Sequence, residues 1–375
     1  MPFWINQLAR AARQSNLGRQ MAAAERMLRR VLRIELPNPA VTTGTTAFFT
    51  AAPEPRAPVV EITPAPETTQ PPPKQRCAAF TRQVFEFEDH HYCFNLYVPP
   101  LPPITSANEE STDVPLVVML HGCKQDAPDF ARGTTMNELA AQTPCMVLYP
   151  EQLPKANQLR CWNWFDSAHQ GRHAGEPAML ATLTRHVIAE YPVDPTRVYI
   201  AGLSAGGAMA AIVAAHNPDL FAAVGVHSGL PPGAAHNVIS AFSAMRHGGH
   251  SRAAGDPAAL KDVMPTIVFH GDADSTVHPN NGDQIVLAAI AALKASGVPL
   301  TRSVIPQELP APTGEMRHTL RTVYSAEDKR PFVEYWSVQA GPHAWSGGNA
   351  AGSFTDPHGP NASTAMLAFF LQHRR

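Results

Sequence analysis

The sequence lacks several features that would assign it to a common class of protein. It contains no run of about 18 apolar residues, so we expect no helix that crosses a membrane. The N-terminus has no uninterrupted apolar stretch with a cleavage site, which argues against a standard signal peptide and favours a cytoplasmic location. Charged residues make up only 16% of the chain and the net charge is −2, which gives no reason to expect nucleic acid as a partner.

Cysteine is also scarce. The five cysteines stand far apart and form no C-x-x-C pair, so the sequence indicates neither a metal site nor a dense disulfide framework. A single disulfide remains open as an alternative. What the chain does have is 375 residues and 44% hydrophobic content, enough for a sizeable core in one large domain or two small ones.

Three segments differ in composition. Residues 1–36 carry seven arginines between apolar residues at loosely helical spacing, which predicts a basic amphipathic helix or helix pair. Residues 37–75 hold ten of the 37 prolines, and proline at that density predicts an extended linker. Residues 76–375 combine strand and helix patterns and are predicted to form the main folded domain.

In this third segment, apolar strands alternate with helices. The continuous apolar run at 115–121 is typical of a strand buried on both faces. The alternation predicts an α/β domain, with a mostly parallel central sheet covered by helices on both faces. A leading antiparallel pair is expected at 84–87 and 92–98, and a surface excursion over 231–262. The other expected strands are 146–149, 197–201, 222–226, 266–270, 319–324 and 332–338, and the expected helices are 134–142, 176–190, 208–216, 282–295 and 360–373.

Residues 202–206 read Gly-Leu-Ser-Ala-Gly, a G-x-S-x-G pentapeptide. An expected strand precedes it and an alanine-rich helix follows, which is the context of a nucleophile elbow and narrows the fold to an α/β-hydrolase. Gly202 and Gly206 would let the strand and the helix approach closely. Ser204 is then the candidate nucleophile. The alternative is a chance match in a chain that contains 24 glycines.

A serine hydroxyl becomes a nucleophile when a base accepts its proton and an acid orients that base. In this fold the acid and then the histidine follow the serine along the chain. The loop after the strand 266–270 carries two competing candidates for the acid, Asp272 and Asp274. His343 lies between the last expected strand and the last helix, where the base belongs. The position of His358 indicates the entry to the final helix instead.

An acyl-transfer site also needs two converging backbone N–H donors for the oxyanion. We expect one from Ala205, directly after the nucleophile. The second would come from Cys123, in the His-Gly turn after the strand 115–121, although an ordinary strand-ending turn is the alternative.

An unusually aromatic loop, Cys-Trp-Asn-Trp-Phe, occupies residues 161–165. Trp162 and Trp164, with Trp345 beside the candidate base, are candidates to line the substrate pocket. Core packing is the alternative. If Cys161 and Cys123 lie close together, a bridge between them would brace the oxyanion loop.

Together these segments resemble the polyhydroxybutyrate (PHB) depolymerase family of esterases, relatives of the feruloyl and acetyl-xylan esterases. The resemblance implies carboxylic-ester hydrolysis through an acyl-enzyme on Ser204, with His343 as base and then acid. Hydrolases of this fold often show H-G-x-x-D-x-x-V with a catalytic last aspartate, which favours Asp274 over Asp272. The resemblance covers roughly residues 80–370, and its pieces are LHGCKQ at 120–125, CWNWF at 161–165, YPVDPTRVY at 191–199, GLSAGG at 202–207, the Asp274 loop and GPHAW at 341–345.

Three functional hypotheses follow. The leading one is a cytoplasmic serine esterase that acts on poly(3-hydroxybutyrate), hydroxyalkanoate oligomers or similar short acyl esters and needs no metal or organic cofactor. The second is a feruloyl or acetyl-xylan esterase. The third is a non-catalytic binding module whose segment 1–36 associates with an anionic membrane or granule surface. Many relatives in the resembled family are secreted, so secretion is the alternative location. Acyl chain length and oligomeric state stay open.

Overall fold

The computed structural model describes residues 78–101, 113–249, 264–307 and 316–375. Contacts within the chain separate Met1–Gln75 from Arg76–Arg375. The basic helix predicted over residues 1–36 and the linker predicted over 37–75 lie outside the described residues. In the described part of the chain, no helix has the length and apolar character needed to cross a bilayer.

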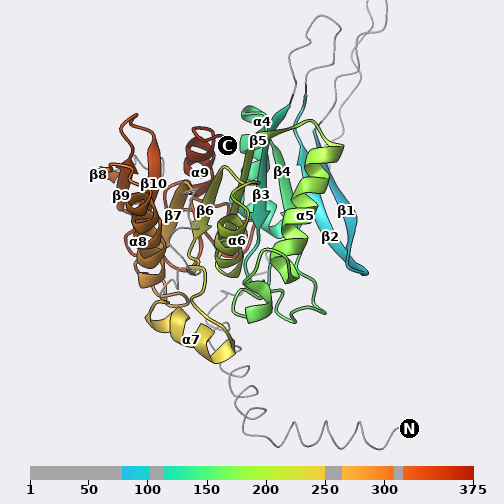
Figure 1. Ribbon diagram of the computed structural model, residues 1–375, viewed down its shortest axis with the longest axis horizontal. Helices are drawn as coiled ribbons and strands as arrows, with labels where there is room; N and C mark the ends of the chain where they lie inside the picture. Colours follow the sequence, from blue (N-terminus) through green and yellow to red (C-terminus); the bar gives the residue numbers. More distant parts are fainter. Residues whose placement is uncertain (1–77, 102–112, 250–263, 308–315) are drawn as a thin grey trace, which may run out of the picture. The chain divides into compact units, whose positions relative to one another are not determined.

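A ten-stranded sheet forms the centre of the domain (Figure 1). Its middle six strands, from β4 to β10, are mutually parallel, and antiparallel strands extend it at both edges. The predicted mostly parallel sheet and its leading antiparallel pair are therefore confirmed. In spatial order the strands are β1 (Ala79–Phe87), β2 (His90–Val98), β4 (Met146–Pro150), β3 (Val114–Leu120), β5 (Val193–Leu203), β6 (Ala223–His227), β7 (Thr266–Gly271), β10 (Pro331–Val338), β9 (Thr319–Ser325) and β8 (Thr301–Gln307).

Helices cover both faces of this sheet, as the sequence predicts. Strand β3 shows why both faces must be covered: Leu116, Val118 and Leu120 point into one apolar cluster. Val117 and Met119 point into a second cluster on the opposite face. The first cluster is closed by α5 (Gly175–Glu190), α6 (Ala205–His216), α7 (Val238–His247) and α8 (Asn280–Ala295), and the second by α3 (Ala127–Thr134), α4 (Met136–Gln142) and α9 (Ala362–Phe370).

Several details differ from the sequence prediction. The helix expected at 134–142 is α4, and a helix that was not expected, α3, precedes it; Thr135, with a left-handed φ of 53°, separates the two. The segment 231–262 contains α7, which an Asn237 capping box begins. Strand β8 was not expected, because it carries a proline and the side chains of residues 301–306 are all exposed, so no alternating apolar pattern marks it. The short pair β11 (Trp345–Ser346) and β12 (Thr355–Asp356) and the turn η1 (Ser167–His169) were also not expected.

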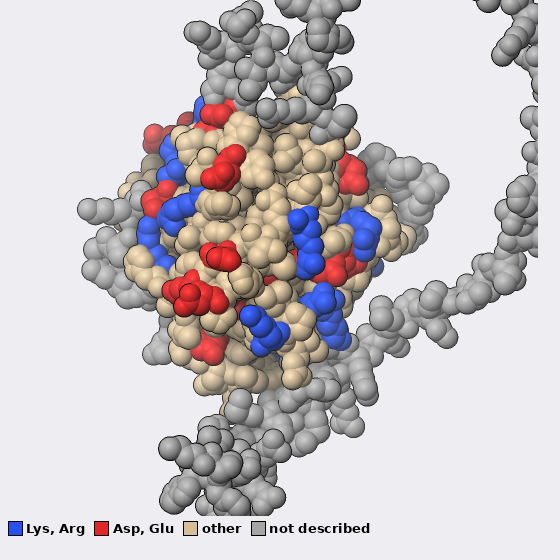
Figure 2. All heavy atoms as spheres, turned by 90° about the vertical axis from the view of Figure 1, so that its right-hand side faces the viewer, with Lys and Arg blue, Asp and Glu red and all other residues tan. Residues whose placement is uncertain are grey.

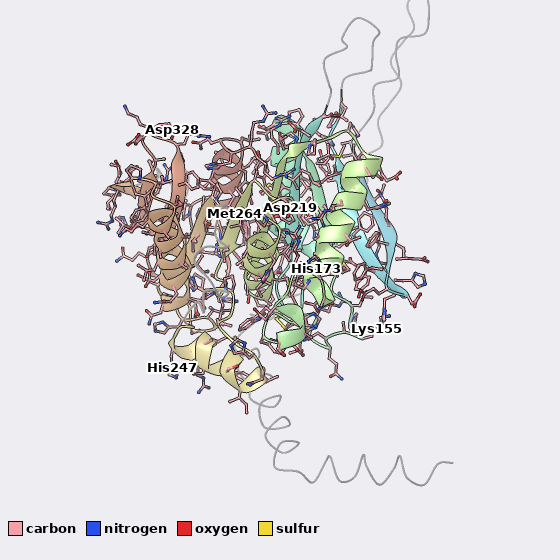
Figure 3. The ribbon with its side chains drawn as sticks, viewed as in Figure 1. Lys155, His173, Asp219, His247, Met264 and Asp328 are labelled. Carbon is pink, nitrogen blue, oxygen red and sulfur yellow. A yellow bond between two sulfur atoms is a disulfide. The ribbon has the colours of Figure 1, made fainter. Side chains whose placement is uncertain are left out.

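The carboxyl ends of the parallel strands meet at one end of the domain, and loops from several strands gather there. Lys155 in the β4–α5 connection and His247 at the end of α7 lie at this end, whereas Asp328 in the β9–β10 turn lies at the opposite end (Figure 3). On the face seen in Figure 2, acidic and basic side chains are interspersed among neutral ones. In α/β sheets, ligands bind outside the carboxyl ends of the strands.

Candidate active site

Ser204 stands at the sharp turn between β5 and α6. Its backbone has a φ of 57° and a ψ of −119°, a strained conformation for a residue with a side chain. Such strain in a strand–turn–helix connection is the signature of a nucleophile elbow. The chance-match alternative for the G-x-S-x-G pentapeptide is not compatible with this geometry.

Two glycines make the turn sterically accessible. A Cβ atom on Gly202 would overlap with the backbone of Gly206, and a Cβ atom on Gly206 would overlap with the carbonyl oxygens of Leu120 and His121. The strand–helix contact and the approach of the His121 turn therefore both require the absence of a side chain. Gly202 and Gly206 do what the sequence predicts.

A line of backbone hydrogen bonds connects the carboxyl ends of the strands that carry the predicted residues. The N–H of Ser204 donates to the carbonyl of His227 at the end of β6, at 2.9 Å. The N–H of Ser228 donates to Phe269 of β7, and the N–H of Asp272 donates to Val338 of β10. Ser204, the Asp274 loop and the His343 loop therefore all lie at the carboxyl ends of the parallel strands.

The predicted acid and base lie in contact. The Nδ1 atom of His343 is 2.7 Å from Oδ2 of Asp274. The Asp274 side chain is buried, and its Oδ1 accepts the N–H groups of Thr276 and Val277. Asp274 thus has one oxygen fixed by its own loop and the other turned to the imidazole.

The two competing aspartates have different surroundings. Asp272 is exposed, and its Oδ1 accepts the N–H of Ala340 at 2.6 Å. It therefore joins its own loop to the loop that carries His343, but Asp274 is the aspartate that bonds the imidazole. His358, the other histidine considered, lies just before α9, where its carbonyl accepts the N–H of Arg317.

Electrostatics keep Asp274 ionised. Burial alone would raise the pKa of its carboxyl, but the electrostatic interaction with His343 and hydrogen bonds from His270 and His343 outweigh burial and hold this pKa well below its usual range. His270 is fully buried and donates its Nε2–H to the carbonyl of Val277 at 2.8 Å, with Asp274 Oδ2 at 3.4 Å. Sequence reasoning did not assign a role to His270.

His227 lies beneath the site and is held neutral. Its Nε2 accepts the N–H of Ser346, and its ring stacks on Phe269 and Trp345. Burial, with further contributions from His270 and His343, lowers the pKa of His227 to about 3. No protonation of this ring is therefore expected at neutral pH.

The predicted oxyanion donors come from two elements that touch. Ala205 is the first residue of α6, so its N–H has no acceptor within the helix. Cys123 follows the end of β3, in the turn against which Gly206 packs. A disulfide joins Cys123 to Cys161, with 4.2 Å between their Cα atoms. The bridge that the sequence left open is therefore present in the structure.

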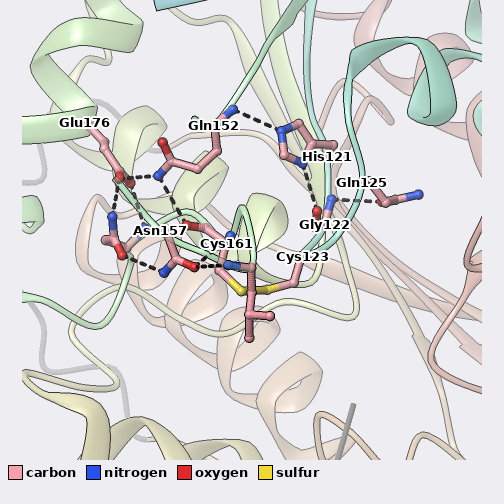
Figure 4. The surroundings of a disulfide bond; sticks show 10 residues. His121, Gly122, Cys123, Gln125, Gln152, Asn157, Cys161 and Glu176 are labelled. Carbon is pink, nitrogen blue, oxygen red and sulfur yellow. Dashed lines mark hydrogen bonds between the residues drawn. A yellow bond between two sulfur atoms is a disulfide. The ribbon is translucent and has the colours of Figure 1, made fainter. Parts of the chain in front are cut away.

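A buried hydrogen-bond network holds the loop that contains Cys161, the second cysteine of the disulfide (Figure 4). Glu176 at the start of α5 accepts the N–H and the side-chain amide of Asn163, and also the amide of Gln152. The same Gln152 amide donates to the carbonyl of Cys161. Burial raises the pKa of Glu176, whereas the hydrogen bonds from Gln152 and Asn163 favour its charged form. The loop 161–163 is thus fixed beside the oxyanion turn.

The side chain of Gln125 joins the Gly122–Cys123 turn to the segment that follows His343. Its Oε1 accepts the N–H of Gly122 at 2.9 Å, and its Nε2 donates to the carbonyl of Ser353 at 2.9 Å. Ser353 also donates its N–H to Asp129 of α3. Sequence reasoning missed this connection, because nothing in the spacing of residues 125 and 353 relates them.

The three predicted substrate-binding tryptophans are all buried. Trp345 donates its Nε1–H to Ser363 and packs edge-on against Phe130, in the cluster under α3 and α9. Trp162 and Trp164 belong to the opposite cluster, and the Trp162 ring lies 5.7 Å from that of His121. These contacts favour core packing, the alternative that the sequence left open. Substrate binding by these residues stays a prediction. Within the described ranges, no group of three or more His, Cys, Asp or Glu side chains is arranged to hold a metal ion.

Comparison with known proteins identifies the family. A model of the Esterase PHB depolymerase family matches residues 92–297, more than half of the chain. The chain belongs to this family. The matched region contains Cys123, Ser204 and Asp274, whereas His343 lies beyond its end, so the Asp274–His343 contact is an observation of the structure alone.

Two curated relatives and one solved structure show the range of similar proteins. Poly(3-hydroxyalkanoate) depolymerase C of Paucimonas lemoignei is 34% identical over 186 residues, 46% of this chain and 44% of that protein. Feruloyl esterase B of Neurospora crassa is 33% identical over 121 residues, 32% of this chain and 40% of that protein. The chain therefore spans less than half the length of either relative. An acetyl xylan esterase from Aspergillus awamori covers 78% of this chain and 99% of its own, with a TM-score of 0.54 and 19% identity, and this likeness shows the shared α/β-hydrolase fold.

Proposed function

We propose that this protein is a serine esterase that hydrolyses carboxylic esters through an acyl-enzyme on Ser204. The observation that carries the proposal is the buried Asp274 carboxylate in contact with His343, at the sheet edge where the strained Ser204 turn also emerges. An acid, a base and an elbow serine at one edge form the constellation of acyl-transfer enzymes. Membership of the Esterase PHB depolymerase family supports the same reaction.

In the proposed mechanism, Nε2 of His343 accepts the Ser204 proton as the hydroxyl oxygen attacks the ester carbonyl carbon. Asp274 accepts the Nδ1–H of His343, which fixes the tautomer and stabilises the imidazolium that forms. The N–H groups of Ala205 and Cys123 stabilise the oxyanion. Collapse of the intermediate transfers the proton from His343 to the leaving alcohol, and water then hydrolyses the acyl-enzyme by the same sequence of steps.

The proposed substrates are hydroxyalkanoate oligomers or similar short acyl esters. The name of the Paucimonas lemoignei relative, a poly(3-hydroxyalkanoate) depolymerase, supports this class. Feruloyl or acetyl-xylan esters are the second class, which the name of the Neurospora crassa relative supports. Rates on 3-hydroxybutyrate oligomers, methyl ferulate and acetylated xylan, measured side by side, will distinguish the two classes.

The location of the protein is a separate question. The cytoplasmic location expected from the sequence stays a prediction, and the Cys123–Cys161 disulfide supports the alternative of an oxidising compartment. Association of segment 1–36 with a membrane or granule surface is also a proposal. Binding of the full chain to anionic vesicles and to PHB granules, compared with a chain that starts at residue 76, tests it.

The activity has a direct test. A fluorophosphonate probe should label the wild-type chain and leave Ser204→Ala unlabelled. Ser204→Ala and His343→Ala should each lower ester turnover by several orders of magnitude while their circular dichroism and melting temperature stay close to wild type. Retention of more than a tenth of the activity by either variant rejects the assignment. A wild-type chain that is neither labelled nor active would favour the non-catalytic binding module.

A further inference from the structure

His121 is a buried histidine whose two ring nitrogens both have fixed partners. Its Nδ1 is 2.8 Å from the carbonyl oxygen of Gly122, and its Nε2 is 3.1 Å from the backbone nitrogen of Gln152. Only 1% of the residue is exposed to solvent. Figure 4 shows the ring between these two partners.

These partners determine the protonation state of the ring. A carbonyl oxygen can only accept, so Nδ1 carries the proton and donates it to Gly122. A backbone N–H can only donate, so Nε2 is the unprotonated nitrogen and accepts from Gln152. His121 is therefore the neutral Nδ1–H tautomer. Burial lowers the pKa of His121, in agreement with a ring that stays neutral.

The carbonyl that His121 holds belongs to the same peptide unit as the Cys123 N–H. The described residues contain no cis peptide bond, so the carbonyl and the N–H of this planar unit point in opposite directions. By fixing the Gly122 carbonyl on one side, the imidazole directs the Cys123 N–H to the other. Cys123 is the residue expected to supply the second oxyanion donor.

The neighbouring N–H groups of the turn already have acceptors within the protein. Gly122 donates its N–H to the side chain of Gln125, and Lys124 donates its N–H to the carbonyl of Leu159 at 2.7 Å. The disulfide to Cys161 holds the side chain of Cys123. The orientation of the peptide between residues 122 and 123 is thus set from both ends. Among the described hydrogen bonds, His121 is the only side chain bonded to the Gly122 carbonyl oxygen. The backbone N–H of Gln125 donates to the same oxygen at a longer distance of 3.3 Å.

We propose that His121 is a positioning residue for the reaction: its Nδ1–H orients the Gly122–Cys123 peptide so that the Cys123 N–H faces the developing oxyanion. The inference rests on the proposed esterase function. His121 itself does not touch the substrate, and it acts only through this peptide. The competing explanation is that the ring merely fills space beside Trp162, 5.7 Å away.

Two substitutions separate the roles of the two ring nitrogens. His121→Asn places an amide nitrogen near the position of Nδ1, so it keeps a donor for the Gly122 carbonyl and loses the acceptor for Gln152. His121→Gln places an amide oxygen near the position of Nε2, so it keeps that acceptor and loses the donor to Gly122. Both variants remove the ring from the Trp162 contact, and Asn is one methylene shorter than Gln, so packing alone predicts that His121→Asn is at least as damaging as His121→Gln.

The expected result is a difference in kcat between the variants. His121→Gln should lower kcat on a soluble p-nitrophenyl ester about 10- to 100-fold with little change in KM, because loss of an entire oxyanion donor costs about 100- to 1000-fold. His121→Asn should recover most of the lost kcat. The affinity for an alkyl boronic acid, which forms a tetrahedral adduct with the serine, should fall in parallel with kcat in His121→Gln. Equal kcat and equal boronate affinity in the two variants would overturn the proposal.

A measurement on the wild-type chain keeps the test decisive if a variant fails to fold. Long-range proton–nitrogen spectra of the protein labelled with ¹⁵N-histidine should show His121 as the Nδ1–H tautomer between pH 8 and pH 5. An Nε2–H tautomer would remove the hydrogen bond to Gly122 and overturn the proposal. Failure of the esterase function itself would look different, because the wild-type chain would then hydrolyse no ester and bind no boronate.

Discussion

Gly206 and Leu120 lie so close together that the first turn of α6 touches the end of β3 through backbone atoms alone. A Cβ atom on Gly206 would overlap with the carbonyl oxygen of Leu120, and the next carbonyl, that of His121, is almost as near. The nucleophile turn and the oxyanion turn are therefore in van der Waals contact. The proposed site depends on this contact because one proposed oxyanion donor comes from each turn.

The first prediction is that Gly206→Ala is severely destabilising. The new methyl group has only backbone atoms to displace, so the free energy of unfolding should fall by about 3 kcal/mol or more. Gly171→Ala is the matched control, because a Cβ atom there would meet nothing within 4 Å, and its effect should stay within about 0.5 kcal/mol. Denaturant unfolding measures both. A Gly206→Ala protein as stable as the control would contradict the close approach.

The second prediction separates the two aspartates. Asp274→Asn removes the anion that holds His343, and kcat should fall by about four orders of magnitude. Asp272→Asn keeps an acceptor for the N–H of Ala340 and should lower kcat less than about tenfold. Steady-state kinetics on a soluble ester measures both. If Asp272→Asn is the more damaging variant, the assignment of the acid is wrong.

The third prediction concerns the disulfide. Cys123 and Cys161 are 38 residues apart, and loss of a bridge that closes such a loop should lower the free energy of unfolding by about 2–4 kcal/mol. Cys161→Ser should therefore be less stable and, because the bridge braces the Cys123 turn, less active. Cys93→Ser is the control, since Cys93 is a free cysteine. The double variant Cys123→Ser/Cys161→Ser should be about as stable as Cys161→Ser; a further large loss would show that the bridge is not the cause.

The fourth prediction is that stability declines on acidification below about pH 6.5. Burial lowers the pKa of His227 to about 3 and that of His373 to about 4, from a usual 6.5, and lowers that of His121 as well. Between the folded-state values of His227 and His373 and pH 6.5 the unfolded chain binds more protons, so each of these two histidines contributes a loss of about 1.4 kcal/mol per pH unit.

Denaturant unfolding between pH 8 and pH 4 measures this slope. His373→Leu should make the decline shallower, because one of the contributing histidines is gone. The lowered pKa of Asp274 acts in the same direction, but only below about pH 4, where its unfolded form binds a proton. Stability that increases as the pH falls from 6.5 to 5 would contradict the buried neutral histidines.

Much of this molecule could be predicted from local sequence because the relevant signals are local. The glycines of the pentapeptide around Ser204 predict the sharp turn, and the apolar run 115–121 predicts a strand buried on both faces. Asp274 and His343 are 69 residues apart, yet each follows a strand whose end could be located. Because those strands were predicted to be parallel, their carboxyl ends, and therefore both residues, were expected at the same end of the sheet.

The remainder depends on contacts between distant segments that leave no local pattern. The side chains of residues 301–306 in strand β8 are exposed, and among the described strands it pairs with β9 alone, so no periodic apolar pattern marks it. Gly133 lies two residues before the break between α3 and α4, but the left-handed conformation falls on Thr135, which has a branched side chain. Trp345 lies two residues after His343 in the sequence, but its indole turns into the core and donates a hydrogen bond to Ser363. Sequence proximity alone did not predict the direction of that side chain.

The Gln125 amide, bonded at one end to Gly122 and at the other to Ser353, has a consequence for how such a protein can evolve. A substitution that shifts the turn after β3 should also displace the segment around Ser353, which follows His343. The two segments are therefore expected to change together. Substitutions that adapt the protein to a new ester should therefore occur mainly at residues without a side-chain hydrogen bond of this kind. The side chain of Ile239 on α7 is exposed, and we expect related sequences to diverge first at positions of this kind.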